Sequence, residues 1–317
     1  MVDVHYTNGV IAVKEKSLLG DKLLRLCETT AEDAFRALVE SGFGSGAEAA
    51  SSFDAELLCN AEERALDDFI REYAPSEAIA KYLLLPRDYH NAKALVKAER
   101  LKSDAENLLA PDGILAASEI ADCIKNGEYA KLGRELGGAV EEALLAEEIE
   151  GAEVGAIFEK ALFLELSAVC KRHGVLKELL QGRVDRINLL TAYRSTEREF
   201  AEKLYLAGGK LKTEQLSRVF EDAEKAAHAF DGTPYAQFSE LCREAKEKGL
   251  PFTEAERALE SYEAEYFRAK RYELERSQPF LYYVFRRRAE IANARVVLVC
   301  LNAGLEERDI KKRLRAM

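Results

Sequence analysis

Asp88-Tyr89-His90-Asn91 lies within a long run of helix-forming residues, and its pattern occurs twice more in the chain. The other copies are Asp185-Arg186-Ile187-Asn188 and Glu290-Ile291-Ala292-Asn293. Each copy has an acid three positions before an asparagine, and the copies follow one another at about a hundred residues. A pattern that recurs at a nearly fixed period predicts one structural unit used three times.

The composition favours helix along the whole chain. Six prolines and nineteen glycines are few for 317 residues, and 48% of the residues are hydrophobic. Ala, Glu, Leu, Lys and Arg, which are good helix formers, are abundant. No segment shows the sustained alternation of Val, Ile and Thr that marks a strand. The sequence therefore predicts an all-α protein.

Apolar periodicity places the main helices in three similar pairs. We expect a long helix before each copy of the motif, over Phe53–Tyr73, Glu153–His173 and Phe252–Arg276. The motifs themselves are expected within helices over Ser76–Leu101, Val175–Leu206 and a final segment that runs to about Asn302. An amphipathic helix is expected over Val10–Leu26. Val296–Leu301 is apolar on every face, which predicts that protein surrounds it.

Glycine turns divide the chain. Gly113-Ile114-Leu115 and Gly209-Lys210-Leu211 follow the first two motif helices at a similar distance. Division after these turns predicts helical repeats over 1–115, 116–212 and 213–317. Since no linker rich in proline and serine separates them, the repeats should pack as one body.

Acid and asparagine share a helix face in each copy, because positions i and i+3 are neighbours. In one interpretation they tie the motif helix to a neighbouring backbone. In the other, Asp88, Asp185 and Glu290 converge on a shared axis and bind a cation or a basic partner. The structural interpretation is favoured. Pro86 is suited to a first helical position, which would place Asp88 in a first turn and near the positive end of the helix dipole.

Charge is distributed unevenly along the sequence. The net charge is −11, but residues 286–317 carry nine Lys or Arg against four acids. An acidic chain is a poor general nucleic-acid binder, because phosphate contacts need a basic face. We hypothesise that the cations of the basic region lie at a partner interface; they are Arg286, Arg287, Arg288, Lys311, Lys312 and Arg313.

Known catalytic patterns find little support. Asp67-Asp68 resembles the acidic helix by which all-α prenyl-chain enzymes hold magnesium on a diphosphate, but no second acidic cluster is evident. The histidines are isolated, and Cys170-x-x-His173 has no matching pair that would complete a zinc site. The six cysteines occur singly, which is typical of small buried hydrophobes. We therefore expect no catalytic residue, cofactor or metal.

Membrane insertion is not expected. Val296–Leu301 is far shorter than the roughly 20 apolar residues that a bilayer span needs. The first residues, Met1–Tyr6, lack the basic start and apolar stretch of a signal peptide. The sequence predicts a soluble, intracellular protein.

The motif-bearing segments resemble those of a known family. Tyr82–Leu95 is similar to the first signature of the C subunits of A/V-type rotary ATPases, which are called d subunits in vacuolar enzymes. Arg183–Leu189 and Arg288–Arg295 resemble the second and third signatures, and Leu38–Gly44 resembles the loop after the family's N-terminal helices. Pro86 and Ala92 depart from the family pattern without removing a chemical group.

This resemblance implies a fold and a function. It implies three similar helical domains in a funnel with pseudo-threefold symmetry. It also implies a non-catalytic place in the rotor, as the socket between the central shaft, made of the D and F subunits, and the membrane ring of proteolipid subunits. The chain would transmit torque for ATP-linked proton or sodium transport and lie peripherally on the cytoplasmic face of the membrane.

Two alternatives stay open at this point. One is an all-α prenyl-diphosphate-type enzyme with magnesium at Asp67 and Asp68. The other is a helical scaffold unrelated to any ATPase. Neither accounts for three matched motifs in order.

Overall fold

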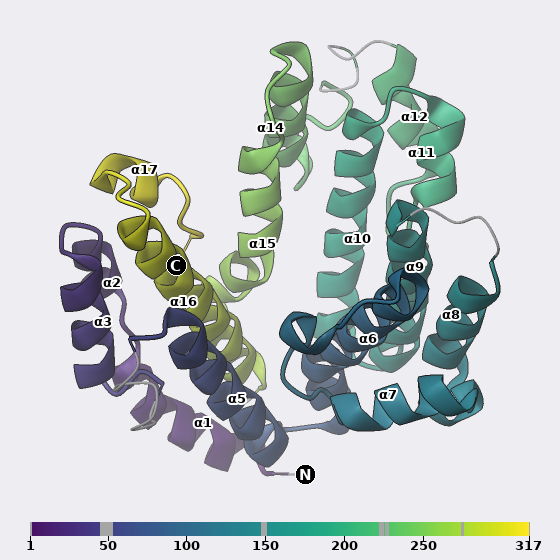
Figure 1. The fold of residues 1–317 in the computed structure, drawn as a ribbon. Helices are drawn as coiled ribbons and strands as arrows, with labels where there is room; N and C mark the ends of the chain where they lie inside the picture. Colours follow the sequence, from purple (N-terminus) through teal and green to yellow (C-terminus); the bar gives the residue numbers. More distant parts are fainter. Residues whose placement is uncertain are drawn as a thin grey trace. The chain divides into compact units, whose positions relative to one another are not determined.

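The computed structural model describes residues 2–44, 53–146, 151–221, 225, 228–273 and 276–316. Within these ranges every regular element is a helix, which confirms the all-α prediction (Figure 1). The chain forms two compact units. Unit 1 combines Met1–Ala80 with Glu260–Met317, and unit 2 consists of Lys81–Leu259.

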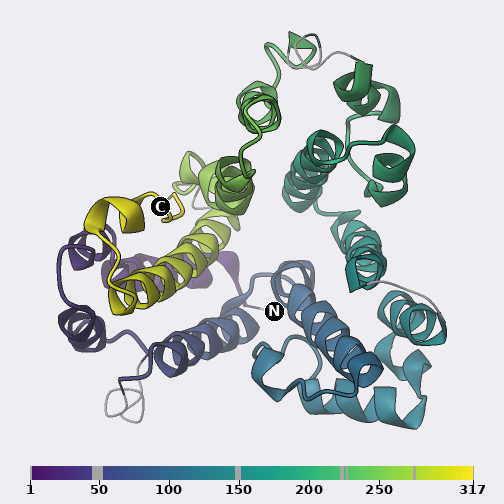
Figure 2. The ribbon, with the colours of Figure 1, turned by 45° about the horizontal axis from the view of Figure 1, so that its top comes forward.

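Unit 1 is built around one central helix, α16 (Gln278–Asn302). Segments far apart in the sequence pack against it, as Figures 1 and 2 show for α5 beside α16. Phe280, Leu281 and Val284 of α16 are fully buried. The helices around it are α1 (Val4–Lys14), α2 (Asp21–Leu26), α3 (Ala31–Glu40), α5 (Ala55–Tyr73) and α17 (Glu307–Lys311). A 3₁₀ turn, Glu15–Ser17, follows α1.

Unit 2 has a core around α10 (Gly174–Arg194). Leu189 and Tyr193 of α10 share that core with side chains of α12 and α14. The helices of this unit are α7 (Ala117–Asn126), α8 (Arg134–Leu145), α9 (Gly151–Cys170), α11 (Arg198–Leu204), α12 (Thr213–Glu221) and α14 (Ala236–Glu247). The 3₁₀ turns Glu106–Leu108 and Tyr129–Leu132 join them, and α6 (Glu77–Leu101) and α15 (Thr253–Arg268) cross the unit boundaries.

The expected long helices and motif helices all occur, but several boundaries were wrong. The helix expected over Val10–Leu26 is two helices, because α1 ends at Lys14 and α2 begins at Asp21. Gly20, just before α2, has a φ of +52°, a left-handed conformation that favours glycine. Val175–Leu206 is two helices, because α10 ends at Arg194 and α11 follows. α15 ends at Arg268 instead of Arg276.

Pro86 lies in the interior of α6, so the expectation that it begins a helix was wrong. A proline inside a helix costs about 3 kcal/mol relative to alanine. Its neighbours Leu84, Leu85 and Tyr89 are buried. Burial of each such side chain contributes about 1.5–3 kcal/mol, which is enough to keep the helix continuous. Asp88 is therefore a mid-helix residue, away from the dipole end.

Burial follows the predicted pattern at most of the cysteines but not at Cys300 or Val299. Five cysteines are buried and Cys300 is half-buried. Burial raises the pKa of the Cys59, Cys170 and Cys242 thiols to about 12. In Val296–Leu301, however, Val299 is 51% exposed, so the expectation that protein surrounds this segment was wrong on that side of α16.

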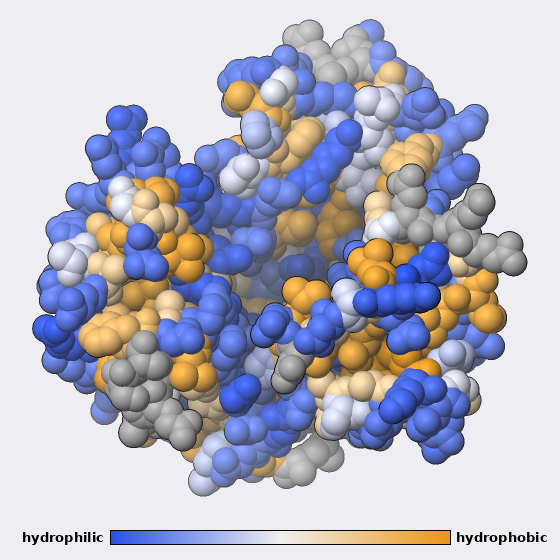
Figure 3. Space-filling view, in the orientation of Figure 1, coloured by the Kyte–Doolittle hydropathy of each residue, from blue (hydrophilic) through white to orange (hydrophobic). Residues whose placement is uncertain are grey.

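None of the helices described by the structure has the length and apolar character needed to cross a bilayer. Hydrophilic side chains occur over much of the visible face in Figure 3, between smaller apolar areas.

Helix α8 was not expected, because Gly137-Gly138 lowers helix propensity in its middle. The two glycines have different surroundings. A Cβ on Gly137 would lie 2.2 Å from the Tyr129 carbonyl oxygen, whereas a Cβ on Gly138 would meet nothing within 4 Å. Gly137 thus lets α8 approach the preceding 3₁₀ turn.

Substitution of these adjacent glycines should have opposite effects. We expect Gly138→Ala to stabilise the protein by about 0.5–1 kcal/mol through helix propensity. We expect Gly137→Ala to destabilise it by about 1–3 kcal/mol, because backbone must move. Urea unfolding followed by circular dichroism measures both. Equal effects of the two substitutions would contradict the close approach at Gly137.

Candidate functional site

The three acid–asparagine motifs lie in the middle of α6, α10 and α16, and all six side chains are buried. The largest exposed fraction among them is 4%, for Asn188. Buried polar groups must be hydrogen-bonded to be stable. Their partners therefore define what each motif does.

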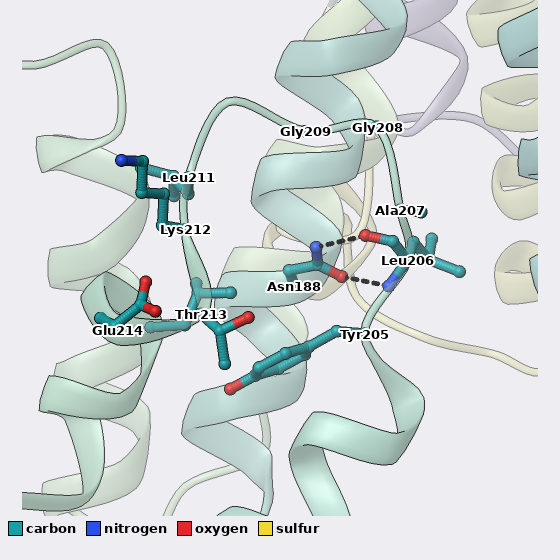
Figure 4. Close-up of a pocket in the computed structure, with 11 residues that line it drawn as sticks. Asn188, Tyr205, Leu206, Ala207, Gly208, Gly209, Leu211, Lys212, Thr213 and Glu214 are labelled. Atoms are coloured by element: carbon teal, nitrogen blue, oxygen red, sulfur yellow. Dashed lines mark hydrogen bonds between the residues drawn. The ribbon is translucent and has the colours of Figure 1, made fainter.

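The asparagines all make the same pair of hydrogen bonds. In each case Nδ2 donates to a backbone carbonyl, and Oδ1 accepts from the N–H of the same residue. The partners are Ala110 for Asn91 (3.2 and 2.8 Å), Leu206 for Asn188 (2.9 and 2.8 Å; Figure 4) and Arg315 for Asn293 (3.1 and 2.8 Å). A planar amide presents a donor and an acceptor side by side. Each asparagine can thus hold an irregular segment as a neighbouring strand would.

The first two acids hold the glycine turns. Asp88 accepts from the N–H groups of Ile114 (3.2 Å) and Leu115 (3.1 Å). Asp185 accepts from the N–H of Leu211 (2.9 Å) and from the Tyr235 hydroxyl. The partners in the turns follow their acids by 26 or 27 residues. Each turn leads into a short helix, α7 or α12.

Glycine is required at these turns because the acid occupies the space of a side chain. A Cβ on Gly113 would lie 2.2 Å from Oδ1 of Asp88, and a Cβ on Gly209 would lie 2.2 Å from Oδ1 of Asp185. Real Cβ atoms do not approach so closely. The spacing between acid and glycine seen in the sequence thus reflects direct contact in space.

The third acid has a different partner, which comes from the early part of the chain. Oε1 of Glu290 accepts from the N–H of Gly20 at 2.9 Å, across 270 residues of sequence. Its Oε2 accepts from Nη1 of Arg287 at 3.0 Å. Glutamate is one methylene longer than aspartate, and this carboxylate binds a turn and a guanidinium together.

Arg287 links Glu290 to a second buried acid, Glu62 of α5. Nε and Nη2 of Arg287 donate to Oε1 of Glu62 at 2.9 and 2.6 Å, and Oε2 of Glu62 accepts from the N–H of Gly44 at 2.7 Å. Burial alone lowers the pKa of Arg287, but the Glu62 and Glu290 carboxylates outweigh it, so the pKa is raised. The guanidinium stays charged and also lies 5.1 Å from the centre of the Phe43 ring.

Comparison with known proteins gives the same three motifs a family context. A family model of the ATP synthase (C/AC39) subunit matches residues 7–313. This chain belongs to that family. The C subunit of the A-type ATP synthase from Desulfurococcus sp. (strain SY) is 30% identical over 164 residues, which cover 49% of this chain and 43% of that protein. The matched region thus spans less than half of the relative's length.

Family membership confirms the resemblance to the C subunits of A/V-type ATP synthases. It does not favour the alternatives of a prenyl-diphosphate-type enzyme or an unrelated scaffold. The motifs' contacts are those of the structural interpretation, since each acid and each asparagine bonds backbone of its own unit. The expected domain limits 1–115, 116–212 and 213–317 stay a prediction.

Asp67 and Asp68 do not face one site. Asp67 is 1% exposed and lies 4.0 Å from Arg288, whereas Asp68 is exposed and pairs with Arg71 at 2.8 Å. Consecutive helical residues point about 100° apart. Within the described ranges, no three or more His, Cys, Asp or Glu side chains gather as a metal site would need. This arrangement does not support a shared magnesium site.

The cations of the basic region fall into two sets. Arg287 is buried in its ion pairs, Arg286 lies 3.7 Å from Glu290, and Arg288 lies beside Asp67. Lys311, Lys312 and Arg313 are on or beside α17 and more accessible. Lys311 pairs with Glu28 and Glu307, and Lys312 pairs with Asp309. The second set is thus the part of the hypothesised interface that a partner could reach.

Four contributing residues were not predicted from the sequence: Gly20, Gly44, Glu62 and Tyr235. Gly44 belongs to the loop that resembles the family's, whereas Gly20 fell inside the helix expected over Val10–Leu26 and carried no such signal. An open cavity of about 410 Å³ adjoins the second motif and is lined by Asn188, Tyr205, Gly208, Gly209 and the start of α12 (Figure 4). The Asn188 pair forms part of its wall, so this polar cavity belongs to the same turn.

The pairing of Asn188 with Leu206 should depend on its amide donor. Asn188→Asp keeps the size of the side chain but turns an acceptor toward the Leu206 carbonyl and buries a charge. We expect a loss of about 2–4 kcal/mol in unfolding free energy, measured in urea. Asn302→Asp, at an exposed position, is the matched control and should change stability by less than about 0.5 kcal/mol. Similar effects at the two positions would refute the pairing.

Removal of Arg287 alone should lower the unfolding free energy more than removal of Arg287 together with both of its acids. Arg287→Met leaves Glu62 without its guanidinium and Glu290 with only Arg286, 3.7 Å away, and we expect a loss of about 3–5 kcal/mol in unfolding free energy. The triple variant Arg287→Met, Glu62→Leu, Glu290→Met should recover part of this loss, because both buried carboxylates are removed and only Arg286 loses a partner, at 3.7 Å. The exposed pair Arg36–Glu32 provides the control, with Arg36→Met costing less than about 1 kcal/mol. A triple variant no more stable in urea than Arg287→Met would show that unpaired charge is not the cause.

Proposed function

We propose that this chain is a non-catalytic rotor subunit of an A/V-type ATP synthase. It joins the shaft, made of the D and F subunits, to the membrane proteolipid ring and transmits torque for ATP-linked proton or sodium transport. The observation that carries this proposal is the family match over residues 7–313. The named relative, the C subunit of an A-type ATP synthase, supports the same assignment.

The internal contacts suit a part that transmits torque. A torque-bearing element must resist deformation, and side chains buried in the middle of helices tie three irregular segments to those helices. Such ties remove local freedom from turns that water would otherwise solvate. They support a rigid connector in which no side chain needs to move for chemistry.

We propose a peripheral position for the chain, on the cytoplasmic face of the membrane and held there by the complex. The finding that no described helix can cross a bilayer is compatible with that position. Contact with the membrane would then pass through the proteolipid ring.

The test is binding of the purified chain to the D–F shaft and, separately, to the detergent-solubilised proteolipid ring. Binding to both supports the socket role. Binding to neither, by a chain whose circular dichroism shows it to be folded, overturns the proposal. Binding to only one would overturn the connecting role and leave a one-sided attachment.

The interface hypothesis has its own test, now limited to the accessible cations. Charge reversal of Lys311, Lys312 and Arg313 to Glu should weaken binding to a partner by about tenfold or more and change its salt dependence. Reversal of Lys171, Arg172 and Lys177, which are exposed in unit 2, is the matched control. Unchanged binding in the first variant, with a folded protein, would show that the basic region does not face a partner.

A further inference from the structure

Three turns that contain glycine donate backbone N–H groups to motif acids and lead into short helices. The first two glycines leave no room for a Cβ beside the acid, whereas a Cβ on Gly20 would meet nothing within 4 Å. Gly113 precedes α7, Gly209 precedes α12, and Gly20 immediately precedes α2. In the first two cases the turn follows its acid in the sequence. In the third case the turn precedes its acid by 270 residues.

We propose that the repeat containing the third motif is a permuted copy of the other two: its glycine turn and short helix come from segment 4–44, at the start of the chain, instead of following the motif helix. We call segment 4–44 the clasp. In this arrangement α2 corresponds to α7 and α12, while residues after α16 supply only the partner of the asparagine. The clasp is the last part of the protein to fold and the first part to open.

Three of the contacts that hold segment 4–44 reach across more than 260 residues of sequence, and a fourth joins Gly44 to Glu62 across 18 residues. The N–H of Gly20 binds Glu290, and the N–H of Gly44 binds Glu62, which Arg287 joins to Glu290. Nδ2 of Asn8 donates to the carbonyl of Arg276 at 3.1 Å. Lys311 pairs with Glu28 at 3.1 Å. Two backbone amides of the segment thus depend on one buried carboxylate–guanidinium network.

The apolar packing has the same dependence. Leu23, Phe35 and Leu38 of α2 and α3 are at most 4% exposed, and both helices pack against α16. Until α16 has formed, the apolar side chains of α2 and α3 cannot be buried against it. In unit 2 the corresponding turns bind acids that precede them by only 26 residues in the sequence. Contacts at long sequence separation form later, because a larger loop must close first.

Local opening of the clasp depends on the same contacts as its folding. The clasp exposes backbone amides when the network releases Gly20, and the Asn293–Arg315 pair lies on the same helix as Glu290. We therefore expect Gly20 and Arg315 to become accessible in one cooperative step. Unit 2 keeps its own two motifs closed in that step, since its hydrogen bonds are internal.

Native-state hydrogen exchange of the full chain, measured by mass spectrometry over rising urea concentration, tests the proposal. Peptides containing Gly20 and Arg315 should exchange together and at lower urea than peptides containing Leu206 and Leu211. Pulse labelling during refolding should show the reverse order of protection. If Gly20 exchanges together with Leu211, or independently of Arg315, the clasp does not exist as a unit.

A matched pair of variants separates the clasp from general destabilisation. Glu290→Gln keeps the shape but replaces charge-assisted hydrogen bonds by neutral ones, so exchange at Gly20 and Arg315 should rise by about tenfold or more, with Leu211 unchanged. Asp185→Asn should raise exchange at Leu211 and leave Gly20 unchanged. A uniform rise across the chain in both variants would overturn the proposal, and none of these readouts depends on assembly into an ATP synthase.

Discussion

Hydrogen bonding of a buried mid-helix side chain to the backbone of an irregular segment is the constraint on which both units depend. A turn packed against a helix loses water from its N–H and C=O groups, and those groups need new partners. Asn91, Asn188 and Asn293 provide both a donor and an acceptor to one residue each. The acids then accept further N–H groups. Without these side chains, helices could still pack, but the segments between them would have no defined path.

The same interaction explains why the three motifs are alike and yet not identical. Asp88 and Asp185 reach turns whose glycines leave no room for a side chain. Glu290 accepts hydrogen bonds from both Gly20 and Arg287, and Arg287 also donates to a second acid, Glu62. A buried ion network of this kind is weak support for stability as a whole, because desolvation offsets its attraction. Its role in unit 1 is positional, since it holds the Gly20 amide on Glu290 of α16 and the Gly44 amide on Glu62 of α5, with Arg287 joining the two acids.

The two unit cores show where local preference and packing disagree. Pro86 interrupts the helix signal, but buried leucines beside it keep α6 continuous. Gly137 and Gly138 lower the helix propensity of α8, so the sequence did not predict this helix. Gly137 is nevertheless necessary, because the Tyr129 backbone approaches it closely. Val299 was predicted to be buried but is exposed, because a single apolar residue can remain on the surface at little cost in free energy. In each case the neighbours in space decided the outcome.

The sequence by itself determined the all-helical class, the long and motif helices, the place of the six motif residues within those helices and the family resemblance. These features depend on composition, on helical periodicity and on short spacings, all of which are local. The tertiary structure alone decided that Gly20 lies on Glu290, that Gly44 lies on Glu62, and that Arg287 is buried between the two acids. Those contacts join residues that are up to 270 positions apart, and no local pattern encodes which turn a carboxylate will meet. They form because packing against α16 brings these backbone amides out of water and next to the acids.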